Sequence, residues 1–333
     1  MMKPLVALLP DGRRLHLHHG PIDLVAECFG AVAEISASYE QARQRFQTVL
    51  EELVAELPLL RTPIDGFHAG TESSSIVRPE PVEGRKTGLR QAQPERRRRT
   101  SHKLVEEPQG AIARRMVAVV RKHEGLVTPM AAVAGAVAEE ILEAMVAGRS
   151  LWRAYVNNGG DIAFMLDAGE RFQVGVVNNE ALPGLNAQVE LRYNHPVRGL
   201  ATSGWRGRSH SLGIADAVTV LARTAAEADV AATLIANAVN AEHPGIVRQP
   251  ACALEDDSDL GDRLVTVAVP ELPQNVVASA LECGVVLAQA LLDSGHIEAA
   301  YLALQGETRT LSNLQTQQIH DRPDPNPQNH HHA

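Results

Sequence analysis

The sequence predicts an α+β fold, in which a mainly antiparallel sheet is packed with long helices. Successive strand candidates, such as 152–156 and 162–166, are separated by short turns, and short connections favour antiparallel over parallel pairing. Long helical stretches, 224–240 and 274–294, stand between further strand candidates. Aromatic residues make up only 3% of the chain, so Ala, Val, Leu and Ile must form most of the core.

The N-terminal part begins with three strand candidates, LVALLP, RRLHLHHG and PIDLVAECFG, the first two joined by an Asp11-Gly12 turn. Residues 40–60 have apolar side chains at helical spacing, and AIARRMVAVVRKH forms a second helical stretch. Thr128 followed by Pro129 predicts an N-cap and a first helical position, opening a helix that continues to about residue 148.

The C-terminal part contributes most of the predicted strands. Each is a short run rich in β-branched or aromatic residues, bounded by turn-forming residues. Beyond the two already named, these are 172–177, 188–193, 218–222, 264–269 and 299–305.

One domain, 1–314, is predicted, interrupted by a disordered insertion at 63–109 and followed by a disordered tail at 315–333. Within the insertion, 77–103 carries nine Lys or Arg and three Glu, a net charge of +6, and has almost no apolar periodicity. The peptides PEPVE and LRQAQ can be encoded by a DNA inverted repeat, which favours an inserted element over a functional basic arm.

Charge and composition exclude several classes of protein. The chain has a net charge of -9, so the part outside 77–103 carries -15, which disfavours nucleic-acid binding. The N-terminus lacks the features of a signal peptide, and no uninterrupted apolar run is long enough to span a bilayer. Cys28, Cys252 and Cys283 are far apart, without a CxxC pair. We therefore expect a cytoplasmic protein with no membrane partner.

The stretch VNNGGDI lies between two strand candidates and is the first candidate for ligand binding. Asn158, Gly159, Gly160 and Asp161 combine conformational freedom with backbone N–H groups that could face a ligand. The structural alternative is a tight hairpin turn of the Asn-Gly kind.

The segment 199–239 holds the second candidate. Thr224 and Glu227 form a capping box, which fixes where the helix begins and stacks Asp229 and Thr233 on one face. A carboxylate and a hydroxyl at this spacing suit Mg²⁺, which takes few protein ligands. The alternative is an acidic residue that complements the helix dipole and a threonine bonded within its own helix.

Just upstream lies a glycine- and arginine-rich loop with Ser203, Gly204, Arg206, Arg208 and His210. Backbone N–H groups and guanidinium groups can bind a phosphate, and His210 could act as a general base for a hydroxyl nucleophile. His210 could equally be an ordinary loop histidine.

In order, VNNGGDI, TSG(x5)H and VTVLA(x5)AD(x3)T resemble the ApbE family of Mg²⁺-dependent FAD:protein FMN transferases. The similarity is closer to an uncharacterised ApbE-like branch that carries RG(I/L)ATSGWRGRSHSLGIADAVTV. The resemblance implies a two-layer tunnelling-fold architecture, FAD as ligand, and transfer of FMN to a Ser or Thr hydroxyl of an acceptor protein. It places the metal at Asp229 and Thr233, the flavin nucleotide at Gly159, Gly160 and Asp161, and the SG…H element at Ser203, Gly204 and His210.

The sequence also departs from the transferase pattern. Ala134 stands where the transferases usually have a lysine, Glu139 stands in place of an aspartate, and the Ile-x-Asp-Pro run after the histidine is missing. A second function therefore stays open: a non-catalytic ligand-binding or sulfur-assimilation protein that kept the fold and lost the transfer chemistry. The oligomeric state, including a homo-oligomer, is also open.

Overall fold

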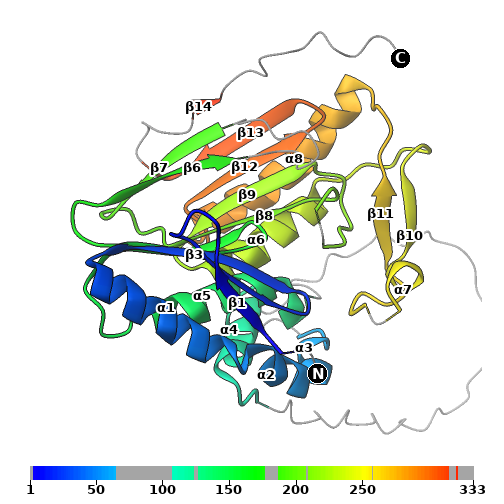
Figure 1. Ribbon diagram of the computed structural model, residues 1–333. Coiled ribbons are helices and arrows are strands. Elements are labelled where there is room, and N and C mark those ends of the chain that lie inside the picture. Colours follow the sequence, from blue (N-terminus) through cyan, green and yellow to red (C-terminus); the bar gives the residue numbers. More distant parts are fainter. Residues whose placement is uncertain are drawn as a thin grey trace, which may run out of the picture.

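The computed structural model describes residues 3–64, 107–123, 127–176, 187–207, 209–256, 258–314 and 320–321. Its centre is a nine-stranded sheet in the order β1-β2-β3-β4-β5-β8-β9-β12-β13, and every pair in it is antiparallel. Figure 1 shows this sheet with the long helices packed on one side. The predicted α+β class is confirmed.

The strands of the large sheet are β1 (Leu5–Leu8), β2 (Leu15–His19), β3 (Ile22–Gly30), β4 (Leu151–Asn158), β5 (Asp161–Leu166), β8 (Gly199–Ser203), β9 (Ala217–Ala222), β12 (Ala299–Leu304) and β13 (Glu307–Ser312). The helices are α1 (Val32–Phe46), α2 (Val49–Ala55), α3 (Leu57–Leu60), α4 (Ala111–Val120), a 3-10 turn η1 (Pro129–Ala132), α5 (Val133–Val146), α6 (Ala225–Ala238), α7 (Ala251–Leu254) and α8 (Gln274–Asp293). Two smaller sheets are β10 (Val247–Pro250) with β11 (Leu264–Ala268), and β6 (Arg171–Val176) with β7 (Ala187–Arg192) and β14 (His320–Asp321).

Helices α5, α6 and α8 cover successive parts of the large sheet: α5 packs on β4 and β5, α6 on β8 and β9, and α8 on β12 and β13. Among the described residues, the small sheet that contains β7 covers part of the opposite face. There, Phe164 and Leu200 share a cluster with Val189 and Leu191 of β7. The three-stranded sheet thus adds a partial third layer to the two layers that the resemblance implied.

Most predicted strands lie where the sequence placed them, but two large-sheet strands were missed. The segment GLATS forms β8 and ETRTLS forms β13. The strand predicted at 152–156 is longer than expected. It includes Asn157 and Asn158, since β4 ends at Asn158. Thr128 occupies the predicted N-cap position, yet its hydroxyl donates to Asp259 at 2.5 Å and makes no cap hydrogen bond.

Helix α8 has the length and composition of a membrane span, with a mean hydropathy of 1.7 over its most apolar window. It was the only such helix in the part of the chain that the structure describes. The helix packs against α6, β12 and β13, as a core helix does. The absence of a membrane partner stays a prediction.

The extent of the domain and its insertion also stay predictions, because residues 65–106, 315–319 and 322–333 lie outside the described residues. Residues at both ends of the predicted insertion contact the rest of the domain. Ile64 forms a bridge with Val127, and the backbone N–H groups of Gln109 and Gly110 donate to the carboxylate of Glu56. In the predicted tail, His320–Asp321 pair with β7.

Candidate functional site

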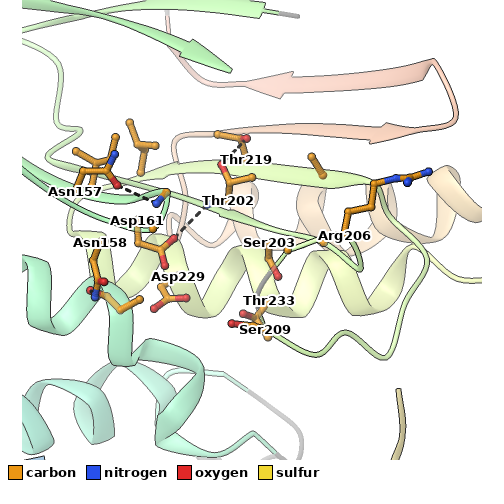
Figure 2. A pocket seen from close by; sticks show the side chains of 18 of the residues that line it. Asn157, Asn158, Asp161, Thr202, Ser203, Arg206, Ser209, Thr219, Asp229 and Thr233 are labelled. Atoms are coloured by element: carbon orange, nitrogen blue, oxygen red, sulfur yellow. Dashed lines mark hydrogen bonds between the residues drawn. The ribbon is translucent and has the colours of Figure 1, made fainter. Parts of the chain in front are cut away.

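A cavity of about 280 Å³ lies where the β4–β5 hairpin, strands β8 and β9, and helix α6 meet. Figure 2 shows side chains from these elements turned toward one another. Of the residues predicted as site residues, Asn158, Gly159, Gly160, Asp161, Ser203, Gly204, Arg206, Asp229 and Thr233 all line it. Segments far apart in the sequence therefore contribute to one site.

The tip of the β4–β5 hairpin forms one wall of this cavity. Asn158 pairs with Asp161, which leaves Gly159 and Gly160 as a two-residue turn with φ of 65° and 112°. Positive φ at both positions is typical of a type I′ hairpin and explains both glycines. The predicted hairpin turn and the predicted cavity wall are thus the same structure.

The turn differs in two respects from the predicted arrangement of backbone N–H groups that face a ligand. The N–H of Gly160 donates to Oδ1 of Asn157 at 2.8 Å, so this donor is already used. A Cβ added to Gly160 would meet no atom within 4 Å, so the glycine is required by its backbone angle and not by crowding. Asp161 points inward, and its Oδ1 accepts the N–H of Thr202 at 3.2 Å.

Helix α6 supplies the predicted metal ligands. Asp229 and Thr233 are one turn apart and both line the cavity, as the capping prediction requires. Oδ2 of Asp229 accepts the N–H of Gly135 at 3.0 Å. Loss of hydration raises the pKa of Asp229 to about 7, and Glu139 adds to this, while hydrogen bonds from the Gly135 and Ala134 backbone oppose it. The Asp229 carboxyl therefore holds its proton to a higher pH than an exposed aspartate does.

The start of α6 is capped by only half of the predicted capping box. The hydroxyl of Thr224 accepts the N–H of Glu227 at 3.2 Å, as expected. The Glu227 carboxylate does not return to the N-cap but accepts from Nζ of Lys122 at 2.5 Å. The phase of the helix was nevertheless correct, because the N-cap alone sets it.

The loop after β8 forms the other end of the cavity. Nε of Arg206 donates to Oδ1 of Asp216 at 2.7 Å, and its guanidinium lies 4.5 Å from the centre of the Trp205 ring. In Figure 2 the Arg206 side chain extends away from Asp229. The predicted Arg208 lies outside the described residues.

His210 is not among the residues that line the cavity, although Ser209 is. Its Nε2 lies 3.7 Å from Oε2 of Glu255, in the loop that follows α7. The role of His210 as a general base stays a prediction.

Several lining residues were not predicted as site residues. Asn157, Thr202 and Thr219 are polar, and the hydroxyls of Thr202 and Thr219 are 2.8 Å apart. Ala134 also lines the cavity, and its carbonyl accepts from Nδ2 of Asn158 at 3.1 Å. The signal was a polar residue within an otherwise apolar strand, but the strand containing Thr202 had not been recognised.

The charge of the described lining favours a cation. It contains three carboxylates, Asp161, Asp216 and Asp229, and a single cationic side chain, Arg206. No group of three or more His, Cys, Asp or Glu suited to a metal ion was found in the described ranges. Mg²⁺ needs only one or two protein ligands, since water and phosphate complete its shell, so Asp229 with Thr233 fits this ion.

Comparison with known proteins identifies the family. The family model described as "AbpE bacteria" matches residues 6–79 and 87–310. The chain therefore belongs to this bacterial ApbE-like family, as the sequence resemblance predicted.

Curated relatives match over part of their length. A UPF0280 protein from Methanothrix thermoacetophila is 44% identical over 117 residues, which cover 34% of this chain and 46% of the relative. One from Archaeoglobus fulgidus is 40% identical over 144 residues, 42% of this chain and 55% of the relative. The chain thus spans about half the length of these relatives.

Among solved structures, a variant of the flavin transferase ApbE from Vibrio cholerae matches with 12% identity and a TM-score of 0.33. The match covers 93% of this chain and 96% of that one.

Proposed function

We propose that this protein binds a flavin nucleotide in the cavity between the β4–β5 hairpin and α6, with FAD as the expected ligand. We further propose Mg²⁺-dependent transfer of FMN from FAD to a Ser or Thr hydroxyl of an acceptor protein. One observation carries the proposal: Asp229, Thr233, the Gly159-Gly160 turn and the Ser203 loop line the same cavity.

Asp229 and Thr233 would hold the metal ion, whose charge would reduce the repulsion between a pyrophosphate and the carboxylates of the lining. Gly159 and Gly160 leave the hairpin tip without side chains, so a flat or bulky ligand can approach its backbone. Arg206 can present its remaining guanidinium N–H groups to phosphate oxygens while Nε stays on Asp216.

In the transfer, the acceptor hydroxyl oxygen forms a bond to the FMN phosphorus, and the bond from that phosphorus to the bridging oxygen of AMP breaks. AMP leaves, and the hydroxyl proton passes to a base. His210 is the base that the sequence suggests, and its Nε2 lies 3.7 Å from Oε2 of Glu255.

Titration calorimetry with FAD, with and without Mg²⁺, tests the proposal on the wild type, Asp229→Asn and Thr233→Val. Asparagine keeps an oxygen for the Gly135 N–H but loses the charge, so we expect little change in stability and loss of the Mg²⁺ dependence. Thr233→Val should act in the same direction more weakly, because a hydroxyl is the poorer ligand. Wild-type Mg²⁺ dependence in Asp229→Asn would contradict the metal site.

A second candidate is a ligand-binding protein without transfer chemistry, including a sulfur-assimilation protein. Two observations favour it: Ala134 lines the cavity where the transferases usually carry a lysine, and His210 lies outside the lining. FAD binding with no release of AMP, in the presence of Mg²⁺ and a Ser- or Thr-bearing acceptor, would support this candidate.

A further inference from the structure

Helices α5 and α6 cap each other at their N-termini. Oδ2 of Asp229, on α6, accepts the N–H of Gly135 in the first turn of α5 at 3.0 Å. Oε1 of Glu139, on α5, accepts the N–H of Ala226 in the first turn of α6 at 2.7 Å. First-turn N–H groups have no partner within their own helix, and the dipole there favours negative charge. Each carboxylate therefore performs for the other helix what an N-cap side chain does for its own.

The two helix starts are in direct backbone contact. A Cβ added to Gly135 would lie 2.3 Å from the carbonyl oxygen of Ala225 and 2.7 Å from the nitrogen of Ala226. The glycine thus allows an approach that no other residue permits. At this separation, a small shift of the start of α6 would also move Asp229, which lies three residues beyond Ala226.

Glu139 is itself fixed by an ion pair. Its Oε2 lies 3.0 Å from Nε of Arg115, on α4, and its side chain is only 13% exposed. Arg115 also contacts Glu140 at 3.2 Å and Glu143 at 2.7 Å. The carboxylate of Glu139 therefore has one oxygen on α4 and the other on α6, and it lines no part of the cavity.

We propose that Glu139, oriented by Arg115, is a positioning residue for the Asp229–Thr233 pair and sets the metal affinity of the cavity without touching the ion. The inference rests on the proposed function for the metal, but the capping itself can be measured without it. Partners behind metal ligands typically change metal affinity by about 10- to 100-fold when they are removed.

The test uses the full chain, with Mg²⁺ alone as the probe in calorimetry and Mn²⁺ as a spectroscopic substitute. Glu139→Ala should weaken binding by ~10-fold or more. Glu139→Gln keeps an acceptor oxygen for Ala226 but turns its NH2 donor toward Nε of Arg115. It therefore loses the orienting ion pair, and its Mg²⁺ affinity should lie between those of the wild type and Glu139→Ala.

Glu140→Ala is the matched control. Glu140 is the next residue on α5, bears the same charge and shares Arg115, but it reaches Arg45 at 2.7 Å and not α6. It should cost comparable stability and leave Mg²⁺ affinity unchanged. Equal losses of affinity in Glu139→Ala and Glu140→Ala would overturn the proposal.

Amide hydrogen exchange separates this proposal from the proposed function and needs no metal. Glu139→Ala should accelerate exchange at Ala226 and, through the shifted Asp229, at Gly135, while Glu140→Ala should not. If Glu139→Ala does not fold, Glu139→Asp, whose carboxylate is one methylene shorter, should show the same changes in smaller measure. Wild-type protein that binds no Mg²⁺ would contradict the proposed function. Unchanged exchange at Gly135 in folded Glu139→Ala, or in folded Glu139→Asp, would contradict the positioning role.

Discussion

The two ends of the cavity are built differently. At the α6 end, backbone lies against backbone at Gly135 and Ala225, and two half-buried carboxylates, of Asp229 and Glu139, join the helix starts. At the loop end, Gly204 also lies against the backbone of Asp216, but beyond it Arg206 is held only through side-chain contacts with Asp216 and Trp205 and is exposed. A site of this kind can fix the ligands of an ion firmly while it leaves the residues that face a larger ligand free to adjust.

Gly135→Ala should have the largest effect. Its methyl group would lie 2.3 Å from the oxygen, 2.5 Å from the carbon and 2.7 Å from the nitrogen of neighbouring backbone, so the two helices must separate. Overpacking of this kind costs about 3 kcal/mol. Urea denaturation would measure the loss, and a cost below about 0.5 kcal/mol would show that the helix starts can move apart freely.

Acidification should lower the free energy of unfolding through His123. This residue follows α4 and is next to Lys122, whose Nζ donates to Glu227 of α6. Burial lowers the pKa of His123 from 6.5 to about 4, and the nearby His296 and Lys122 add to the effect. Because the unfolded chain binds the proton more readily, the stability contributed by neutral His123 is present above pH 6.5. It is lost as the pH falls toward 4, by up to about 3 kcal/mol.

Denaturation of the wild type and His123→Gln at pH 7 and pH 5 would check this effect. The raised pKa of Asp229 contributes with the opposite sign, since its stabilisation is lost as the pH rises through about 7. The difference between variant and wild type isolates His123. An identical pH dependence in both proteins would mean that His123 is not responsible.

The contrast between the two ends also explains what could be predicted from the sequence. The shared face of Asp229 and Thr233 could be predicted, because the N-cap residue Thr224 determines the helix phase and a spacing of four puts both residues on one face. The Gly159-Gly160 turn could also be predicted, because it depends only on residues next to it in the sequence. The role of Glu139 could not be predicted, because its partner Ala226 is 87 residues away and only the packing of α5 on α6 joins them.

At the loop end, residue types suggested the chemistry but not the positions. Ser203, Gly204 and Arg206 line the cavity. His210 instead lies near Glu255, in the loop that follows α7. Nothing in the sequence around His210 indicates that the loop after α7 lies beside the loop after β8. Strand β8 was missed because its five residues, GLATS, include a glycine and two hydroxyl side chains.

Asp216→Asn should have an intermediate effect and should act on the loop end. Asp216 accepts from Nε of Arg206 at 2.7 Å, from Nε1 of Trp205 at 3.2 Å and from the N–H of Gln305 at 2.6 Å. A single amide oxygen cannot replace all three, so we expect a loss of about 1–2 kcal/mol. Asp293→Asn, at an exposed helix end with one side-chain partner, is the control and should stay within ~0.5 kcal/mol. Equal effects of the two changes would show that Asp216 does not organise the loop.

Gly207→Ala should have the smallest effect, although this glycine lines the same cavity as Asp229. A Cβ at Gly207 would lie 3.4 Å from the carbonyl oxygen of Gly204 and meet nothing closer, so no neighbour needs to move. Thermal and urea denaturation should therefore place Gly207→Ala within about 0.5 kcal/mol of the wild type. Gly204→Ala is the control within the same loop: its Cβ would lie 2.5 Å from the carbonyl oxygen of Asp216, and it should cost about 2 kcal/mol. A large loss in Gly207→Ala would mean that the loop is packed as tightly as the helix pair, and that the loop end of the cavity is as rigid as the α6 end.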